Sequence, residues 1–233
     1  MEHTESMRRR LLADVSHELR TPLTAIGGYM EGLLDGVIPE SPETYKQVWM
    51  EANRLSRLVD DLQELSRVEA GSYRLNFRKV KVSHLIETCV KRLSHQYAEK
   101  NVRLMVVPFS PSEMFQVFAD EDRIIQVMTN LLSNALVYTD IGGEVTISVV
   151  KIGNDIQFTV QDSGIGISAE NVPQIFDRFY RVDKSRSRSA GGGSGIGLTI
   201  AKALVEAHEG RIWAESAGEG MGSKLIFTIP MLK

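Results

Sequence analysis

The stretch Ser16-His17-Glu18-Leu19-Arg20-Thr21-Pro22-Leu23 decides how the chain is organised, because it places a histidine on the face of a helix that points away from its apolar stripe. At about 100° per residue, apolar residues spaced three and four apart form one narrow stripe, as in an amphipathic helix with a coiled-coil-like seam. His17 falls almost opposite this stripe, so we predict an exposed imidazole with Thr21 one turn further on the same side. The stripe consists of Leu12, Val15, Leu19, Leu23, Ile26, Met30 and Leu33.

The neighbours of His17 suit a nucleophile. An imidazole attacks phosphorus only through a neutral ring nitrogen, and the carboxylate of Glu18 can hold the proton on the other nitrogen and stabilise the developing positive charge. Pro22 removes the helical hydrogen bond to the Glu18 carbonyl, which weakens the helix beside the reactive group. The alternative is a merely solvated histidine beside an ordinary proline kink, and the octet alone does not decide between the two.

Composition narrows the functional classes. The chain has 233 residues, 42% of them hydrophobic, which is enough for two modest domains with cores of their own. A net charge of −3 and a pI near 6.0 argue against nucleic-acid binding. The single cysteine, Cys89, excludes an internal disulfide and a cysteine-rich zinc site. No segment resembles a membrane-spanning helix or a secretion signal, so we expect a cytoplasmic chain, joined to a membrane only through a segment absent from it.

Residues 1–72 are predicted to form an antiparallel helical hairpin. The first helix runs from about Glu5 to Asp35 and is broken by Gly36 to Pro39; the second begins at Ser41-Pro42 and ends near Gly71. Each helix carries an apolar stripe that the other cannot fully cover. A second copy of the chain is the simplest cover, which predicts a homodimeric four-helix bundle, whereas packing against the rest of the same chain is the alternative.

Residues 73–233 have a different pattern, in which short β-branched runs alternate with helices. Glycine-rich turns near Gly142 and Gly153 join the later strands into hairpins. The pattern predicts an α+β sandwich: one sheet with helices on one face. The predicted helices span 83–100, 120–138 and 195–209, and the predicted strands span 102–107, 115–118, 144–150, 156–161, 211–215 and 224–229.

Two stretches of this second domain carry side chains that a packed core does not need. Asn130 and Asn134 lie one helical turn apart, and amide oxygens are suitable ligands for a divalent cation that bridges phosphates. Solvated surface asparagines are the alternative. Asp162 follows an apolar strand and precedes Gly164 and Gly166, so its carboxylate can accept a hydrogen bond from an exocyclic amine while bare backbone lies against a flat ring. An Asp-x-Gly turn alone is a weak signal.

Two further stretches point to phosphate. In Phe176-Asp177-Arg178-Phe179-Tyr180-Arg181, aromatic anchors can hold Arg178 and Arg181 against phosphate oxygens. Residues 185–198 are rich in serine, arginine and glycine and cannot order themselves by burial, which suggests a mobile lid whose last glycines open a helix. The spacing matches neither the G-x-G-x-x-G of a dinucleotide fold nor a P-loop.

Together these five stretches resemble the H, N, G1, F and G2 boxes of bacterial sensor histidine kinases, in that order and over nearly the whole chain. The resemblance implies a dimerisation and histidine-phosphotransfer hairpin followed by a Bergerat-type ATP-binding domain. It implies His17 as the phosphoacceptor with Glu18 as its acid/base partner, and Asn134, assisted by Asn130, as the holder of Mg²⁺. It implies Asp162 as the reader of the adenine amine and Tyr138 as a neighbour of the base. Arg178, with Arg181 nearby, would reach the phosphates, and the pocket and lid would be shaped by Gly164, Gly166, Gly193, Gly195, Gly197 and Leu198.

The resemblance also implies a reaction: transfer of the γ-phosphoryl group of ATP to His17, and from there to an aspartate on the receiver domain of a response regulator. Thr21 matches a position associated with dephosphorylation of the regulator. Val137 departs from the family, which commonly has lysine there. A pseudokinase scaffold, in which the ATP site only sets conformation, is therefore one alternative; a Bergerat ATPase of another kind is a second, opposed by the H box. The sequence leaves open whether phosphorylation occurs within one chain or across the dimer.

Overall fold

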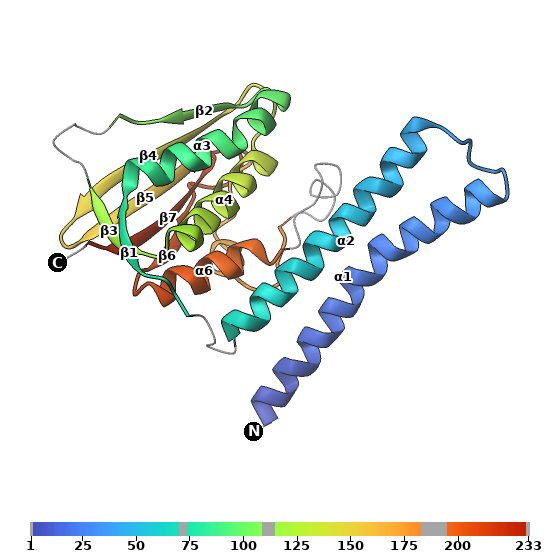
Figure 1. Cartoon of the computed structure of the whole chain (residues 1–233), viewed down its shortest axis with the longest axis horizontal. Helices are drawn as coiled ribbons and strands as arrows, with labels where there is room; N and C mark the ends of the chain where they lie inside the picture. Colours follow the sequence, from blue (N-terminus) through green and yellow to red (C-terminus); the bar gives the residue numbers. More distant parts are fainter. Residues whose placement is uncertain (1, 70–73, 109–114, 183–194, 232–233) are drawn as a thin grey trace. The chain divides into compact units, whose positions relative to one another are not determined.

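The computed structural model describes residues 2–69, 74–108, 115–182 and 195–231, which separate into two compact units (Figure 1). The first unit is helical and extends to Glu64, and the second begins at Leu65. Among the described residues, none of the helices combines the length and apolarity that crossing a membrane requires.

The first unit contains the predicted hairpin of α1 (Glu2–Leu34) and α2 (Pro42–Glu69), except for the last turn of α2, which belongs to the second unit. Ser41 caps α2 as predicted, because its hydroxyl oxygen accepts a hydrogen bond from the Thr44 N–H at 3.1 Å. The two helices are joined by an ion pair between Arg54 on α2 and Glu18 on α1, with a separation of 4.0 Å. α1 continues through Pro22, so the proline lies inside the helix and does not end it.

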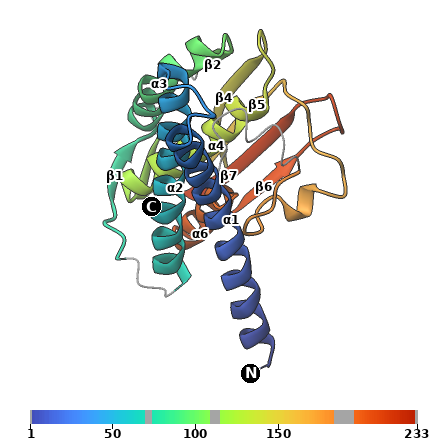
Figure 2. The ribbon, with the colours of Figure 1, turned by 90° about the vertical axis from the view of Figure 1, so that its right-hand side faces the viewer.

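The second unit is built on a five-stranded sheet with the strand order β2-β4-β5-β7-β6. β2 pairs in parallel with β4, and the remaining pairs are antiparallel, so β4 and β5 form the predicted hairpin. Helices α3, α4 and α6 lie on one face of this sheet (Figures 1 and 2). The strands are β2 (Arg103–Val106), β4 (Glu144–Ile152), β5 (Asp155–Asp162), β6 (Ile212–Glu215) and β7 (Ser223–Pro230), and the helices are α3 (Val82–Glu99), α4 (Glu121–Tyr138) and α6 (Gly197–Ala207).

The prediction of a single sheet was wrong in one respect. The strand predicted at 115–118 is β3 (Gln116–Ala119), and it pairs with a strand that the sequence did not reveal, β1 (Arg78–Lys81), in a separate two-stranded sheet. β1 reads Arg-Lys-Val-Lys, and only Val80 is buried, so it carries no alternating apolar signal. Between β5 and α6 the chain forms a short 3₁₀ turn, η1 (Val172–Gln174).

The core lies between the sheet and its helices. The helix-facing residues of β4, β5 and β7 are buried, and the rings of Phe158 and Phe227, which are paired across β5 and β7, stack with centroids 4.6 Å apart. α4 is the most deeply buried helix, because both α3 and α6 pack against it. This packing holds α4 in place, and α4 carries both asparagines of the candidate site.

Replacing Phe158 by alanine should lower the free energy of unfolding of this unit by about 3–5 kcal/mol, because a large ring is removed from a closed core. The measurement is chemical denaturation of the whole chain followed by the fluorescence of Trp213 on β6, in a Trp49→Phe background so that only this unit reports. Val150→Ala is the control, because Val150 is exposed on β4 and its loss should cost no more than about 0.5 kcal/mol. Equal effects of the two substitutions would contradict the location of the core.

Candidate active site

His17 is exposed on α1, as predicted from its place opposite the apolar stripe. One turn further along, the hydroxyl of Thr21 donates a hydrogen bond to the His17 carbonyl oxygen at 3.2 Å. Pro22 has no N–H to offer the Glu18 carbonyl, so the helix loses one bond in the same turn. α2 helps to place the Glu18 carboxylate, which lies 4.0 Å from the guanidinium of Arg54. An imidazole with a neighbouring carboxylate therefore lies at the surface of the hairpin.

Asn130 and Asn134 both lie on α4 and are half-buried. The Asn130 amide nitrogen donates to the Gly197 carbonyl at 2.9 Å, which joins α4 to the first residue of α6 and leaves the amide oxygen as the group available to a ligand. Within the described residues, no hydrogen bond engages the side chain of Asn134. An amide oxygen without a protein partner suits a magnesium ion held between the protein and phosphates.

Asp162 lies at the end of β5 and is buried. One carboxylate oxygen accepts hydrogen bonds from the Gly164 N–H at 2.9 Å and the Ser223 N–H at 3.3 Å, and the other accepts the Ser223 hydroxyl. These donors fix the plane of the carboxylate. A buried carboxylate held in one orientation is a specific acceptor for an amine.

Gly164 explains why backbone can lie so close to this site. A Cβ atom at this position would lie 2.2 Å from the carbonyl oxygen of Tyr138, the last residue of α4. The next N–H, that of Ile165, donates to the same carbonyl at 3.2 Å. The loop after β5 is therefore bound directly to the end of the helix that carries Asn134.

A fourth segment, which the sequence analysis missed, completes this corner of the site. The loop 216–222, between β6 and β7, contacts the backbone at Gly166. The φ angle of Gly166 is +70°, and a Cβ atom there would lie 2.0 Å from the Gly218 carbonyl oxygen. The Ser216 hydroxyl oxygen accepts a hydrogen bond from the Ile167 N–H at 3.0 Å, and the Gly220 N–H donates to the Ile165 carbonyl oxygen at 2.6 Å. The three alternate glycines Gly218, Gly220 and Gly222 were the available signal.

The two stretches predicted to contact phosphate, at 176–181 and at the start of α6, also meet. The Phe179 N–H donates to the Gly195 carbonyl at 3.0 Å, and the Thr199 hydroxyl donates to the Phe176 carbonyl at 3.0 Å. Residues 176–181 are thereby fastened to the beginning of α6, and both Arg178 and Arg181 are half-buried there. Of the predicted lid at 185–198, Gly193 and the other residues up to 194 lie outside the described residues; Gly197 opens α6 and Leu198 follows it.

The described parts of the four predicted stretches thus meet around α4 and the beginning of α6, and comparisons with known proteins give the same identification. The family of histidine kinase-, DNA gyrase B- and HSP90-like ATPases matches residues 119–233, and the His Kinase A (phospho-acceptor) domain matches residues 7–71. The chain belongs to the sensor histidine kinases. Both domains predicted from its motifs are present, in the expected order.

Curated relatives cover nearly all of this kinase chain. The signal transduction histidine-protein kinase BaeS of Escherichia coli (strain K12) is 38% identical over 231 residues, which is 99% of this chain and 48% of BaeS. The sensor histidine kinase WalK of Bacillus subtilis (strain 168) is 39% identical over 234 residues, which is 98% of this chain and 38% of WalK. The chain therefore spans less than half the length of both relatives.

Solved structures share the fold. The Acinetobacter baumannii histidine kinase AdeS is 27% identical with a TM-score of 0.75, over 93% of this chain and 98% of that one. The histidine kinase ThkA, in complex with the response regulator protein TrrA, is 28% identical with a TM-score of 0.79, over 99% of this chain and 64% of the ThkA chain.

Tyr97 of α3 and Lys100, which directly follows α3, support the kinase's α4 from outside the predicted motifs. The Tyr97 hydroxyl donates to the Leu132 carbonyl at 2.8 Å, and the Lys100 ammonium donates to the carbonyls of Leu136 and Val137 at 2.7 and 2.9 Å. Burial, together with the negative charge of Asp162, raises the pKa of the Tyr97 hydroxyl, so it remains a donor at physiological pH. A cation at the last carbonyls also suits the helix dipole.

Gly164→Ala should weaken the binding of Mg²⁺–ATP by about tenfold or more, equivalent to about 1.4 kcal/mol, because the added methyl group displaces the loop from Tyr138. Isothermal titration calorimetry with a non-hydrolysable ATP analogue measures the effect. Gly28→Ala is the matched control, since a Cβ atom there meets nothing within 4 Å. Unchanged affinity in Gly164→Ala would show that the loop does not shape a nucleotide site.

Proposed function

We propose that this chain is the catalytic portion of a sensor histidine kinase that phosphorylates His17 with ATP and passes the phosphoryl group to an aspartate of a response regulator. One observation carries the proposal: an exposed histidine beside a carboxylate on the hairpin occurs in the same chain as a buried aspartate at the end of β5 and two asparagines on α4. Hydrolysis alone needs no histidine on a separate helical unit.

The geometry supports a separate role for each side of the nucleotide site. The fixed carboxylate of Asp162 accepts the adenine amine, and we assign Tyr138, whose carbonyl lies against Gly164, to the neighbourhood of the base. The amide oxygens of Asn134 and Asn130 are the groups that would hold Mg²⁺, which neutralises phosphate charge when bound. The phosphates face the arginines and the start of α6; we assign this side to Arg178, Arg181, Gly193, Gly195, Gly197 and Leu198.

The first transfer forms a bond between a neutral ring nitrogen of His17 and the γ-phosphorus, and breaks the bond between that phosphorus and the oxygen that remains on ADP. Glu18 holds the proton on the other ring nitrogen and stabilises the positive charge that develops on the ring. In the second transfer a carboxylate oxygen of the response regulator attacks phosphorus and the P–N bond breaks, which restores neutral His17. Each step exchanges one bond to phosphorus for another.

Thr21 supports a further reaction, the dephosphorylation of the response regulator. Its hydroxyl hydrogen is donated to the His17 carbonyl, so the hydroxyl oxygen retains a lone pair that can accept a hydrogen bond from water. A water molecule held in this way, one helical turn from His17, is suitably polarised to attack an acyl phosphate.

The hairpin suits dimerisation. Large apolar side chains are exposed along both helices, including Leu23 at 60%, Leu34 at 83% and Trp49 at 66% of their surface, and burying such area in a second copy is favourable. We assign residues 1–72 to dimerisation and phosphotransfer and residues 73–233 to ATP binding. We place the chain in the cytoplasm, where ATP and response regulators are found; the complex of ThkA with TrrA supports a regulator as partner.

A nucleotide-binding scaffold remains the second candidate because of Val137. Its carbonyl accepts the Lys100 ammonium at 2.9 Å, but its side chain offers no cation to the phosphates. In this alternative, ATP binds and changes the conformation of the chain without phosphorylating it.

Incubation with γ-labelled ATP and Mg²⁺ tests the proposal. The parent chain should acquire label that is lost in acid and stable in base, as expected of a phosphoramidate, and His17→Gln should lose it by about two orders of magnitude or more, since no nucleophile remains. His95→Gln is the matched control: His95 is also exposed, on α3, and its replacement should leave labelling unchanged.

The other outcomes separate the candidates. Binding of ATP without label in the parent chain would favour the scaffold, and Val137→Lys would then be expected to restore labelling. Label that persists in His17→Gln would contradict the assignment of the phosphoacceptor.

A further inference from the structure

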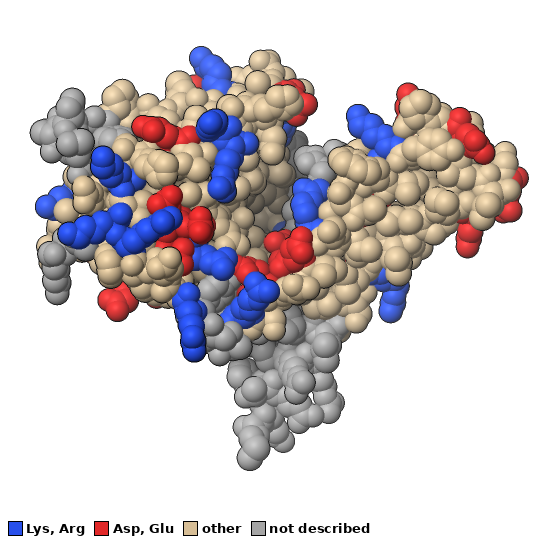
Figure 3. Space-filling view, viewed as in Figure 1, with Lys and Arg blue, Asp and Glu red and all other residues tan. Residues whose placement is uncertain are grey.

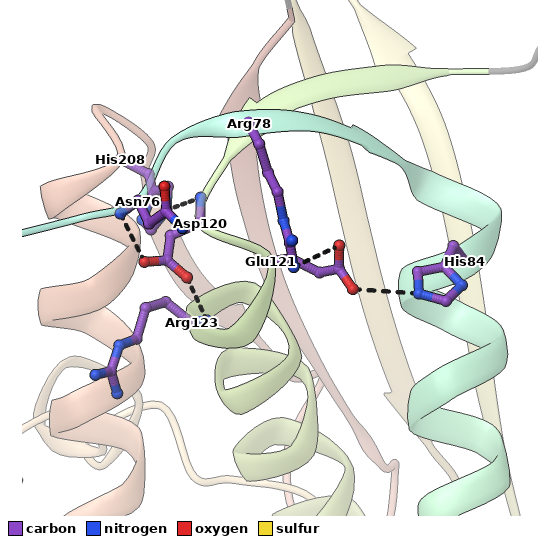
Figure 4. Close-up of polar contacts among 7 residues, drawn as sticks. All are labelled: Asn76, Arg78, His84, Asp120, Glu121, Arg123 and His208. Carbon is purple, nitrogen blue, oxygen red and sulfur yellow. Dashed lines mark hydrogen bonds and ion pairs between the residues drawn. The ribbon is translucent and has the colours of Figure 1, made fainter.

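Four residues form a junction that the kinase motifs do not include. We call it the anchor: Asn76 and Phe77, which lie in the segment before β1, together with Asp120 at the start of α4 and His208 at the end of α6. Figure 4 shows Asn76, Asp120 and His208. The chain passes from the helical hairpin to the ATP-binding unit through this segment. Around it, over β1 and the adjoining ends of α3 and α4, the surface carries basic and acidic side chains in alternation (Figure 3).

Asp120 uses its two carboxylate oxygens for two separate purposes. One oxygen accepts the Arg123 N–H at 3.3 Å and caps the N-terminus of α4. The other accepts the Asn76 N–H at 2.9 Å, 44 residues earlier in the chain. A helix cap needs only the first of these bonds, so the second serves to hold the segment.

His208 connects the same point to α6. Its Nε2 accepts the Asp120 N–H at 3.0 Å, and its Nδ1 lies 2.7 Å from the Leu204 carbonyl oxygen. These two partners require the neutral imidazole with the proton on Nδ1. The ring is 3% exposed and packs 5.1 Å from the ring of Phe77, which stacks on Phe118 of β3. Burial lowers the pKa of the imidazole, in agreement with the neutral form.

The anchor is one of the hydrogen-bonded contacts between the α4 and α6 regions, which also pack against each other along their apolar faces. In another, the Asn130 side chain donates to the Gly197 carbonyl at the opposite end of α6. α4 therefore meets the end of α6 through Asp120 and the beginning of α6 through Asn130. At about 1.5 Å per residue, Asn134 lies about 20 Å along α4 from Asp120. Because helices move as rigid elements, loss of the contact at one end of α6 shifts the two helices relative to each other at its other end.

We propose that Asp120 and His208 are positioning residues for nucleotide binding, and that they couple the segment 74–77 to the two helices that carry the nucleotide site. The proposal rests on the proposed function of Asn130, Asn134 and the start of α6. Fastening the segment stabilises the arrangement of α4 and α6 that binds Mg²⁺–ATP, and releasing it lowers affinity for the nucleotide without altering any residue that touches it.

Asp120→Ser separates the two purposes of the carboxylate. Serine is a good helix cap and keeps an oxygen for the Arg123 N–H, but it lacks the second oxygen that holds Asn76. The expected result is an increase in the Kd for Mg²⁺–ATP, and in the KM of autophosphorylation, of about fivefold or more, the low end of couplings between linked sites. The phosphorylation rate at saturating ATP should stay unchanged, because His17 and the residues around the nucleotide are intact.

Two further comparisons give the test its controls. His208→Leu removes the acceptor for the Asp120 N–H and should weaken binding similarly, whereas His208→Gln keeps an acceptor oxygen and should restore it. Glu121→Gln changes the adjacent residue, whose carboxylate pairs with Arg78 at 3.0 Å and His84 at 3.2 Å at the surface, and should leave affinity unchanged. A purely structural role would lower thermal stability in Asp120→Ser while leaving the Kd as in Glu121→Gln, and would overturn the proposal.

Hydrogen exchange without nucleotide separates this proposal from the function on which it rests. In Asp120→Ser, exchange should increase at residues 76–78 and also at the beginning of α6, where Asn130 meets Gly197. If the parent chain bound no ATP, the proposed function would fail, yet joint exposure of both regions would still support the coupling. Increased exchange confined to 76–78 would overturn it.

Discussion

The contact of the Gly164 backbone with the last carbonyl of α4 is the constraint on which the nucleotide site depends. It joins the loop after β5 to the helix that carries both asparagines, and leaves no room for a Cβ atom. Asp162 is oriented by the same turn, through the Gly164 N–H, and by Ser223 from β7. The carboxylate proposed to accept an amine and the amide oxygens proposed to hold a cation are therefore kept at a set separation by backbone contacts, which deform less than side chains do.

The chemistry of the chain is divided between two units with different physical requirements. The nucleotide site needs burial, because a fixed carboxylate discriminates only when water is excluded from it. In the proposed phosphotransfer His17 needs exposure, because its phosphoryl group would be given to another protein. A hairpin with a narrow apolar stripe allows this, since the face opposite the stripe is left to solvent. The anchor lies where the chain enters the ATP-binding unit from the hairpin.

Much of the fold was predictable because its signals are local. The periodicity of α1, the cap at Ser41 and the alternation along β4 and β5 each depend on a few neighbouring residues. β1 was missed because its stability comes from pairing with β3, far along the chain, and only Val80 is apolar. The loop 216–222 was missed for a related reason: its glycines read as an ordinary turn until Gly166 is placed against Gly218.

The sequence by itself determined the family, the two domains and the types of side chain at the reactive centres, because nucleophile, carboxylate, amides and glycines have recognisable chemistry at fixed spacing. Only the tertiary structure decided how these groups are supported. The bond from Asn130 to Gly197, the hold of Ser223 on Asp162, the cation of Lys100 at the end of α4 and the bond between Asp120 and His208 all join residues far apart in the chain. Such bonds follow from packing, which no short stretch of sequence encodes.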